Sequence, residues 1–111
     1  MSTSWLLVCN YTVLNENIVD LDNGIARLKE LKPRRFNFIG QEDTRDGFVA
    51  HEVTTVPEAI SGTKDEVDEK GEPIYQGIDP SKIVPLLTAA LQEAVTKIET
   101  LEAKVKTLEE A

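Results

Sequence analysis

The most regular hydrophobic pattern of the chain lies at its C-terminal end. An unbroken 3.5-residue repeat of apolar side chains is typical of a coiled coil. We therefore predict a long helix over residues 83–111 that packs against other helices; an amphipathic helix lying on its own domain is the alternative. With Val84 as heptad position a, the a and d positions of this apolar seam are Val84, Leu87, Leu91, Ala94, Ile98, Leu101, Val105 and Leu108.

Charged residues flank this seam at positions that face a neighbouring helix. Lys97 and Lys104 occupy g positions, and Glu102 and Glu109 occupy the e positions that follow them. In a parallel coiled coil such residues form ion pairs between chains. Each exposed pair contributes about 0.5 kcal/mol, so the pairs select orientation more than they add stability.

Nearer the start of the helix, the flanking positions are apolar. Ala90 at g and Val95 at e widen the buried stripe beyond the needs of two strands, so we predict a parallel trimer. Pro85 fits the first turn of the helix, where proline is tolerated. Asp79 or Ser81 can cap the turn that precedes it.

Shorter apolar patterns mark the elements upstream. Residues 4–14, "SWLLVCNYTVL", are rich in strand-forming side chains and predict an extended segment that could pair with another chain. In "ENIVDLDNGIARLKELKP", Asp20 or Asp22 can cap a helix and Pro33 ends it. The apolar residues at helical spacing in this segment are Ile25, Leu28 and Leu31.

The middle of the chain predicts short elements. "RRFNFIG" places Phe36 and Phe38 on one face of a half-buried strand. "EDTRDG" predicts a turn, and "FVAHEVTTV" has the spacing of a short helix closed by Pro57. After the polar segment described next, "IYQGID" predicts a second short strand.

Residues 61–73, "SGTKDEVDEKGEP", are polar and rich in acidic residues, with Val67 as the one apolar side chain beside the proline. A segment of this composition cannot bury itself. It is either a mobile surface loop or a projecting hairpin arm that contacts another molecule. The arm residues would be Lys64, Asp65, Glu66, Val67, Asp68, Glu69 and Lys70.

Composition favours association and argues against nucleic acid as a partner. The 111 residues suffice for one domain with a modest core, and only 5% are aromatic, so a monomer would bury little large apolar surface. The formal charge is −8 and the pI is near 4.6, whereas nucleic-acid binding requires a cationic surface. The short basic run "KPRR" at 32–35 predicts a loop that joins a helix to a strand.

Candidate chemistry is sparse. Cys9 cannot form an intrachain disulfide, and its apolar surroundings favour a buried thiol. His51 stands alone beside an apolar run, so we expect it in the core, and the carboxylates lack metal-ligand spacing. We predict neither a metal nor a cofactor. The run around Cys9 is too short to span a bilayer and lacks the basic flank of a signal peptide, so we expect a soluble, intracellular protein without membrane contact.

Several motifs, in order along the chain, resemble a known family. They are "ENIVDLDNGIARLKELKPRRFNF", "GFVAHEV", "VPEAI", "PIYQGID", "SKIVPLL" and "AALQEA". Together they resemble the C-terminal intramolecular chaperone domain of bacteriophage tail spikes, tail fibres and neck appendages, of the endosialidase type. The resemblance covers roughly residues 10–108.

The resemblance implies a homotrimer with an α+β fold. Residues 1–17 would be an extended lead-in joined to a fibre, 18–82 the body with its arm at about 61–73, and 83–111 the trimerising helix of a parallel coiled coil. The implied function is a trimerisation and folding chaperone that registers three β-structured fibre or spike chains. The alternative is a trimeric tip or connector retained on the fibre. Assembly would take place in the host cytoplasm, and a retained module would belong to the virion.

Most members of this family also cleave themselves, using a Ser-Asp-x-x-x-Lys pattern ahead of the first helix. Alignment on "ENI" puts Asn10 at the serine position and Asn15 at the lysine position, and a carboxamide serves neither role. A shift of one residue would bring Cys9 to the nucleophile position, but no lysine precedes Lys29. We therefore expect no enzyme activity, whether the pair was never present or was replaced. A self-cleaving endopeptidase that uses other residues is the remaining hypothesis.

Overall fold

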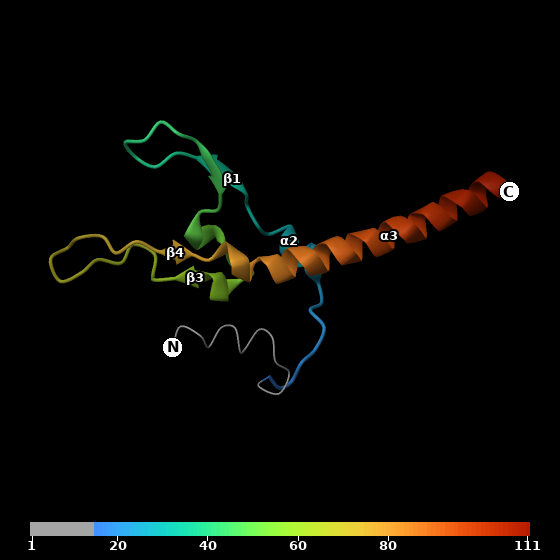
Figure 1. Ribbon diagram of the computed structural model, residues 1–111, viewed down its shortest axis with the longest axis horizontal. Coiled ribbons are helices and arrows are strands. Elements are labelled where there is room, and N and C mark those ends of the chain that lie inside the picture. Colours follow the sequence, from blue (N-terminus) through green and yellow to red (C-terminus); the bar gives the residue numbers. More distant parts are fainter. Residues whose placement is uncertain (1–14) are drawn as a thin grey trace.

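The long C-terminal helix determines the shape of the protein. The computed structural model describes residues 15–111, and helix α3 (Val84–Glu110) contains 27 of them. The helix runs out of a small body and ends far from it (Figure 1). The molecule measures 72 × 43 × 21 Å, and its radius of gyration is 19.8 Å. A compact domain of this length would have a radius of about 13 Å. The predicted long helix is confirmed.

The body combines short helices with small antiparallel sheets, as the α+β prediction requires. Strand β1 pairs with β2, and strand β3 pairs with β4. The predicted extended segment 4–14 lies outside the described residues. In chain order the elements of the body are α2 (Gly24–Leu28), β1 (Arg34–Phe36), β2 (Arg45–Gly47), the 3-10 helices η2 (Ala50–Glu52) and η3 (Pro57–Ala59), β3 (Ile60–Ser61), β4 (Gly77–Ile78) and the 3-10 helix η4 (Pro80–Lys82).

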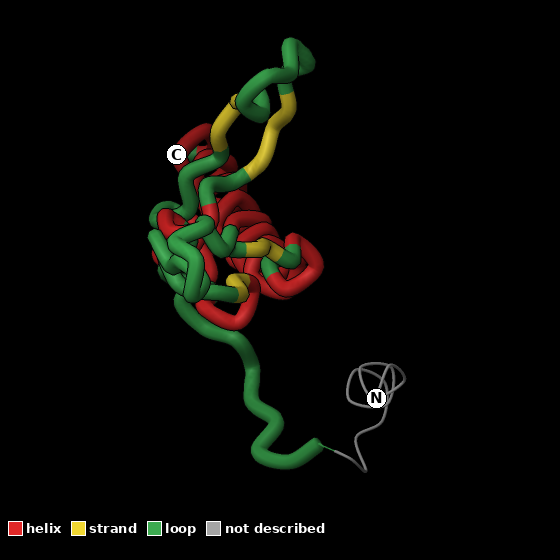
Figure 2. Tube along the Cα trace, turned by 90° about the vertical axis from the view of Figure 1, so that its left-hand side faces the viewer, coloured by secondary structure: helices red, strands yellow, loops and turns green. Residues whose placement is uncertain are grey.

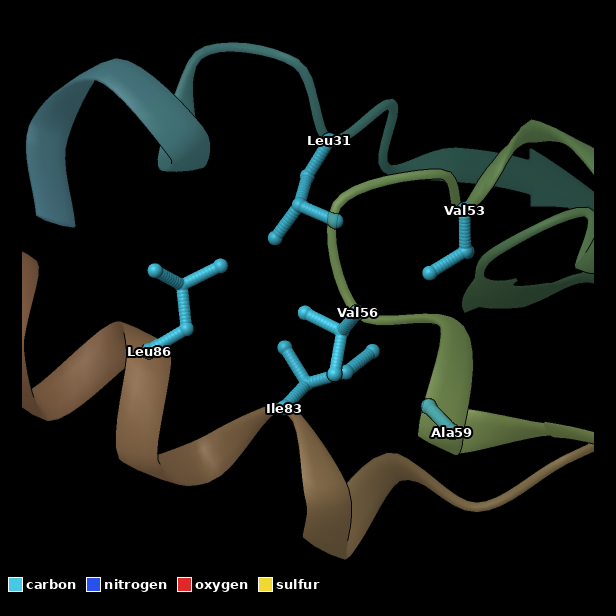
Figure 3. Packing of buried hydrophobic residues seen from close by; sticks show 6 residues of the cluster. All are labelled: Leu31, Val53, Val56, Ala59, Ile83 and Leu86. Carbon is cyan, nitrogen blue, oxygen red and sulfur yellow. The ribbon is translucent and has the colours of Figure 1, made fainter. Parts of the chain in front are cut away.

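A small core joins the start of α3 to the middle of the chain (Figure 3). Ile83 and Leu86 are each only 1% exposed, and they anchor the base of the long helix. Full burial of one such side chain contributes about 1.5–3 kcal/mol, so a core of this size supports a small domain and little more. The core cluster consists of Leu31, Val53, Val56, Ala59, Ile83 and Leu86.

Helix α2 is shorter than the sequence predicts, and neither Asp20 nor Asp22 caps it. Asn23, in the left-handed conformation with φ 54°, takes the N-cap position. A tertiary contact replaces the predicted cap, because Glu93 of α3 accepts a hydrogen bond from the amide of Ile25. The helix ends at Leu28, ahead of Pro33. Leu31 nevertheless reaches the core from the turn that follows.

The segment between β1 and β3 also departs from the prediction. "EDTRDG" is not a turn throughout, because Arg45–Gly47 forms strand β2. The predicted helix over "FVAHEVTTV" is a single 3-10 turn, Ala50–Glu52, followed by extended chain. Pro57 does not close a helix but opens η3, since proline is favourable in a first turn. His51 is exposed on η2, so its expected place in the core was wrong.

Two hairpins project from the body away from the C-terminal end of α3 (Figure 1). One is formed by β1 and β2, and the other by β3 and β4. Viewed along the long axis, the β1–β2 hairpin and the chain that precedes α2 leave the helix on opposite sides (Figure 2). The body therefore leaves the outer part of α3 uncovered.

Candidate functional site: the exposed apolar face of helix α3

The turn that leads into α3 is capped by a local side chain. The Oδ1 atom of Asp79 accepts hydrogen bonds from the Ser81 amide at 3.1 Å and the Ser81 hydroxyl at 2.6 Å. The Ser81 hydroxyl, and then its amide, hold the pKa of Asp79 below its usual range. Pro85 sits in the first turn of α3, as predicted. Of the two predicted caps, Asp79 takes the N-cap position of η4, the turn that leads into the helix.

The apolar seam lies on the surface of the described chain. Its exposed fraction runs from 43% at Leu87 to 75% at Leu108, and Ala94 alone is half-buried. Large apolar side chains scattered singly over a surface are ordinary, but a continuous stripe marks an interaction site. The exposed members of this stripe are Val84, Leu87, Leu91, Ile98, Leu101, Val105 and Leu108.

A different face of α3 packs against the body. Leu86 and Ala90 are each 1% exposed. Gly24 approaches Ala90 so closely that a Cβ atom at position 24 would lie 2.7 Å from the Ala90 amide nitrogen. Glu93 lies one turn further along, and its Oε2 accepts the Ile25 amide hydrogen bond at 2.9 Å. Helix α2 is therefore fixed to α3 by shape and by a hydrogen bond.

This contact corrects the interpretation of Ala90. Ala90 was expected to widen the seam toward neighbouring helices, but Gly24 of its own chain covers it. Val95, the other apolar flanking residue, is 45% exposed, and its burial against a neighbouring helix remains a prediction.

The charged flanking residues are exposed along the outer part of the helix. The Nζ atom of Lys97 lies 3.7 Å from Oε1 of Glu93 in its own chain, an i, i+4 pair. Such pairs contribute a few tenths of a kcal/mol. Glu102, Lys104 and Glu109 point into solvent, where the ion pairs with neighbouring chains remain a prediction.

The polar segment 61–73 is a hairpin, as the second of the two sequence interpretations proposed. Val67 bridges to Pro73, and the amide of Ile74 donates to the carbonyl of Glu66 at 2.8 Å. At the tip, Oδ1 of Asp68 accepts hydrogen bonds from the amides of Lys70 and Glu72. Earlier in the segment, the Nζ atom of Lys64 lies 2.8 Å from Oδ2 of Asp65. The predicted arm residues 64–70 are all exposed.

Exposed apolar side chains accompany the acidic residues of the arm. Tyr75 is 84% exposed, Val67 56% and Ile74 42%. The arm therefore offers both apolar and negatively charged contacts. The hydrogen bond from Lys64, reinforced by its charge, holds the pKa of Asp65 below its usual range.

Sequence reasoning missed the second projection, the β1–β2 hairpin. Arg35 pairs with Asp46 across the strands, with Nε to Oδ1 at 2.8 Å, and this hydrogen bond raises the pKa of Arg35 above its usual value. Phe36 and Phe38 meet edge to face at 5.7 Å, and Arg45 lies over the Phe38 ring. Opposite charges on residues 35 and 46 were the available signal, since cross-strand pairs of this kind stabilise a hairpin.

The basic run 32–35 is partly neutralised by acidic side chains. Arg34 makes a two-atom contact with Glu52, at 3.0 Å and 2.9 Å. The hydrogen bond from Arg34 is the main cause of a lowered Glu52 pKa. Strand β1 begins inside the run rather than after it.

The two positions that align with the cleavage pair of the family that the sequence resembles lie at or beyond the edge of the described chain. Asn10 is outside the described residues, and Asn15 is half-buried at their start. Within residues 15–111, acidic, histidine and cysteine side chains form no group of three or more that could hold a metal ion. In the same range, no helix is both long enough and apolar enough to cross a membrane.

The exposed seam is thus the most extensive candidate site of the described chain, with the two hairpins projecting at the opposite end (Figure 1). No family model, curated protein or solved structure matched the chain.

Proposed function

We propose that three copies of this chain associate in parallel through the α3 seam and act as a trimerisation and folding chaperone for a phage tail fibre or spike. The observation that carries the proposal is the run of a and d side chains, exposed over four heptads except at half-buried Ala94, on a helix whose c and g positions near its base already pack against the body. A coiled coil buries residues of this spacing.

The exposed surface area supports association. The chain exposes 9443 Å², whereas a compact monomer of 12.3 kDa exposes about 6,100 Å². The difference is about 3,300 Å² per chain, which includes the projecting hairpins as well as the seam, and it is large enough to contain an interface of the size that obligate oligomers bury. The sequence pattern still favours a coiled coil of three helices over one of two, chiefly because Val95 extends the apolar surface on one flank of the seam.

A trimer of this kind would assist chains that cannot fold alone. Intertwined β-structure buries its apolar faces only against other chains, so a monomer cannot complete its fold until two further chains join it. Tethering three chains raises their effective concentration to roughly millimolar values. Slow, non-local strand pairing then becomes intramolecular. In this proposal the arms, with Tyr75 and Val67 exposed, contact the fibre chain.

Sedimentation equilibrium tests the assembly, and we expect a mass of three times 12.3 kDa. A monomer at tens of micromolar would contradict the proposal. Co-expression with a β-rich fibre chain then separates the chaperone from a retained tip or connector. A chaperone leaves the assembled fibre, whereas a structural module co-purifies with it. Unchanged intact mass after long incubation is expected for a chain that does not cleave itself.

A further inference from the structure

Helix α2 lies on one flank of α3 only. Its first turn contacts Ala90 through Gly24 and Glu93 through the amide of Ile25. In the heptad register of the seam, Ala90 is a g position and Glu93 a c position. The body therefore covers the g flank of α3 at Ala90. On the e flank, Asp20 and Leu21 lie near Thr88 at the base of the helix, but Val95, two turns further along, is open and 45% exposed.

Val95 is beyond the reach of its own α2. It lies two residues after Glu93, which places the two side chains about 160° apart around the helix. In a parallel coiled coil, a g residue faces the e residue five positions later on the next chain. The g position 90 of one copy is therefore on the side of its neighbour's Val95, and because Gly24 covers Ala90, it is α2 that Val95 would meet there.

We infer that Val95 packs against the first turn of α2 of the neighbouring copy, in contact with Ile25, so that each α2 is held between two α3 helices. This inference rests on the proposed trimer. It also accounts for the change of chemistry along the flanks. The g and e residues are apolar at 90 and 95, where a body excludes water, and charged at 97 and 102, where the helices stand alone.

Disulfide cross-linking of the full-length chain tests the contact. In a Cys9→Ser background, Ile25→Cys is combined with Val95→Cys and oxidised, while native mass spectrometry reports the number of chains. We expect covalent dimers and trimers on a non-reducing gel. The matched control combines Ile25→Cys with Thr96→Cys, which lies at the outward f position and should leave the chains unlinked.

A trimeric native mass without Val95-dependent cross-links would overturn the inference and leave the proposed function standing. A monomeric native mass of the Cys9→Ser parent would contradict the proposed function itself.

A second variant pair covers the case in which the cysteine chains fail to fold. Val95→Asp should weaken trimer association by about tenfold or more, since burial of a valine is lost at each of three contacts. Thr96→Asp should leave association within about twofold of the parent. Equal association constants for the two variants, with helicity retained, would overturn the inference.

Discussion

The amide of Ile25 donates a 2.9 Å hydrogen bond to Oε2 of Glu93, a residue 68 positions further along the chain. An N-terminal amide of a helix usually bonds to a local capping side chain. Here the cap of α2 comes from another helix, so α2 is stabilised only while it is docked on α3. The Nζ atom of Lys97 lies 3.7 Å from Oε1, the other oxygen of the same carboxylate.

Glu93→Ala should therefore destabilise the body. We expect a loss of about 1–2 kcal/mol, the usual cost of removing a helix cap, measured by urea unfolding. Glu99→Ala removes a carboxylate from an exposed site on the same helix and is the control. Equal effects of the two substitutions would show that the hydrogen bond to Ile25 contributes nothing.

Gly24→Ala should destabilise the protein although it raises helix propensity. Alanine in a helix is ordinarily favoured over glycine by about 1 kcal/mol. At this site the added Cβ would lie 2.7 Å from the amide nitrogen of Ala90 and 2.9 Å from the carbonyl carbon of Ala89, both backbone atoms. We expect a net loss of about 1–3 kcal/mol, as for other overpacked sites. A rise in thermal midpoint would contradict the packing.

Leu101→Asp should abolish the proposed trimer. Leu101 is a d position, and the substitution would place three carboxylates against one another in a desolvated seam, at a cost of several kcal/mol. Circular dichroism should show loss of much of the helix signal, and sedimentation should give a monomer. Ala103→Asp, at the outward f position, is the control. An unchanged mass for Leu101→Asp would place the seam elsewhere.

Acidification should weaken the body through Asp79. Its pKa is lowered from the usual 3.8 by hydrogen bonds from Ser81 that favour the charged form. A lowered folded-state pKa gives stability that is present above 3.8 and is lost as the pH falls through the lower, folded value. Asp79→Asn should therefore reduce the change in urea midpoint between pH 6 and pH 3. An unaltered pH dependence would contradict the role of this cap.

Introducing the Ser-Lys pair of the family that the sequence resembles should give rise to self-cleavage. Asn10→Ser together with Asn15→Lys supplies a nucleophile and a base, and burial in the trimer would lower the lysine pKa. Intact mass should report cleavage near residue 10 in the double variant. Each single substitution should remain whole, because a nucleophile without its base gains little. Cleavage of the unaltered chain at this position would contradict its assignment as an inactive site.

The parts of the fold that depend on local spacing were predictable from the sequence. The heptads predicted α3 to within a residue or two, and the composition of segment 61–73 predicted either a mobile loop or a projecting hairpin, of which the structure has the hairpin. Both signals are contained in consecutive residues. The placement of the arm relative to the helix could not be predicted from consecutive residues.

The contacts between distant segments could not be predicted in the same way. The cap of α2 depends on Glu93, and nothing near Asn23 indicates it. Ala90 appeared to belong to the oligomer surface because its heptad position is correct, yet Gly24 of the same chain occupies that surface. Residues 34–36 were predicted as part of a strand, but residues 45–47 look like a turn until Arg35 and Asp46 are paired across the two strands.

The close contact at Gly24 also has a mechanical consequence. From Glu93 to Glu110 the helix extends about 26 Å without support from its own body. A tilt of about 10° at the contact with α2 would displace the far end by roughly 5 Å, about half the spacing of two packed helices. The contact between Gly24 and Ala90 is thus the point about which α3 would tilt relative to the body. In the proposed trimer, the rigidity of this contact would determine how accurately the C-terminal ends of the three helices align.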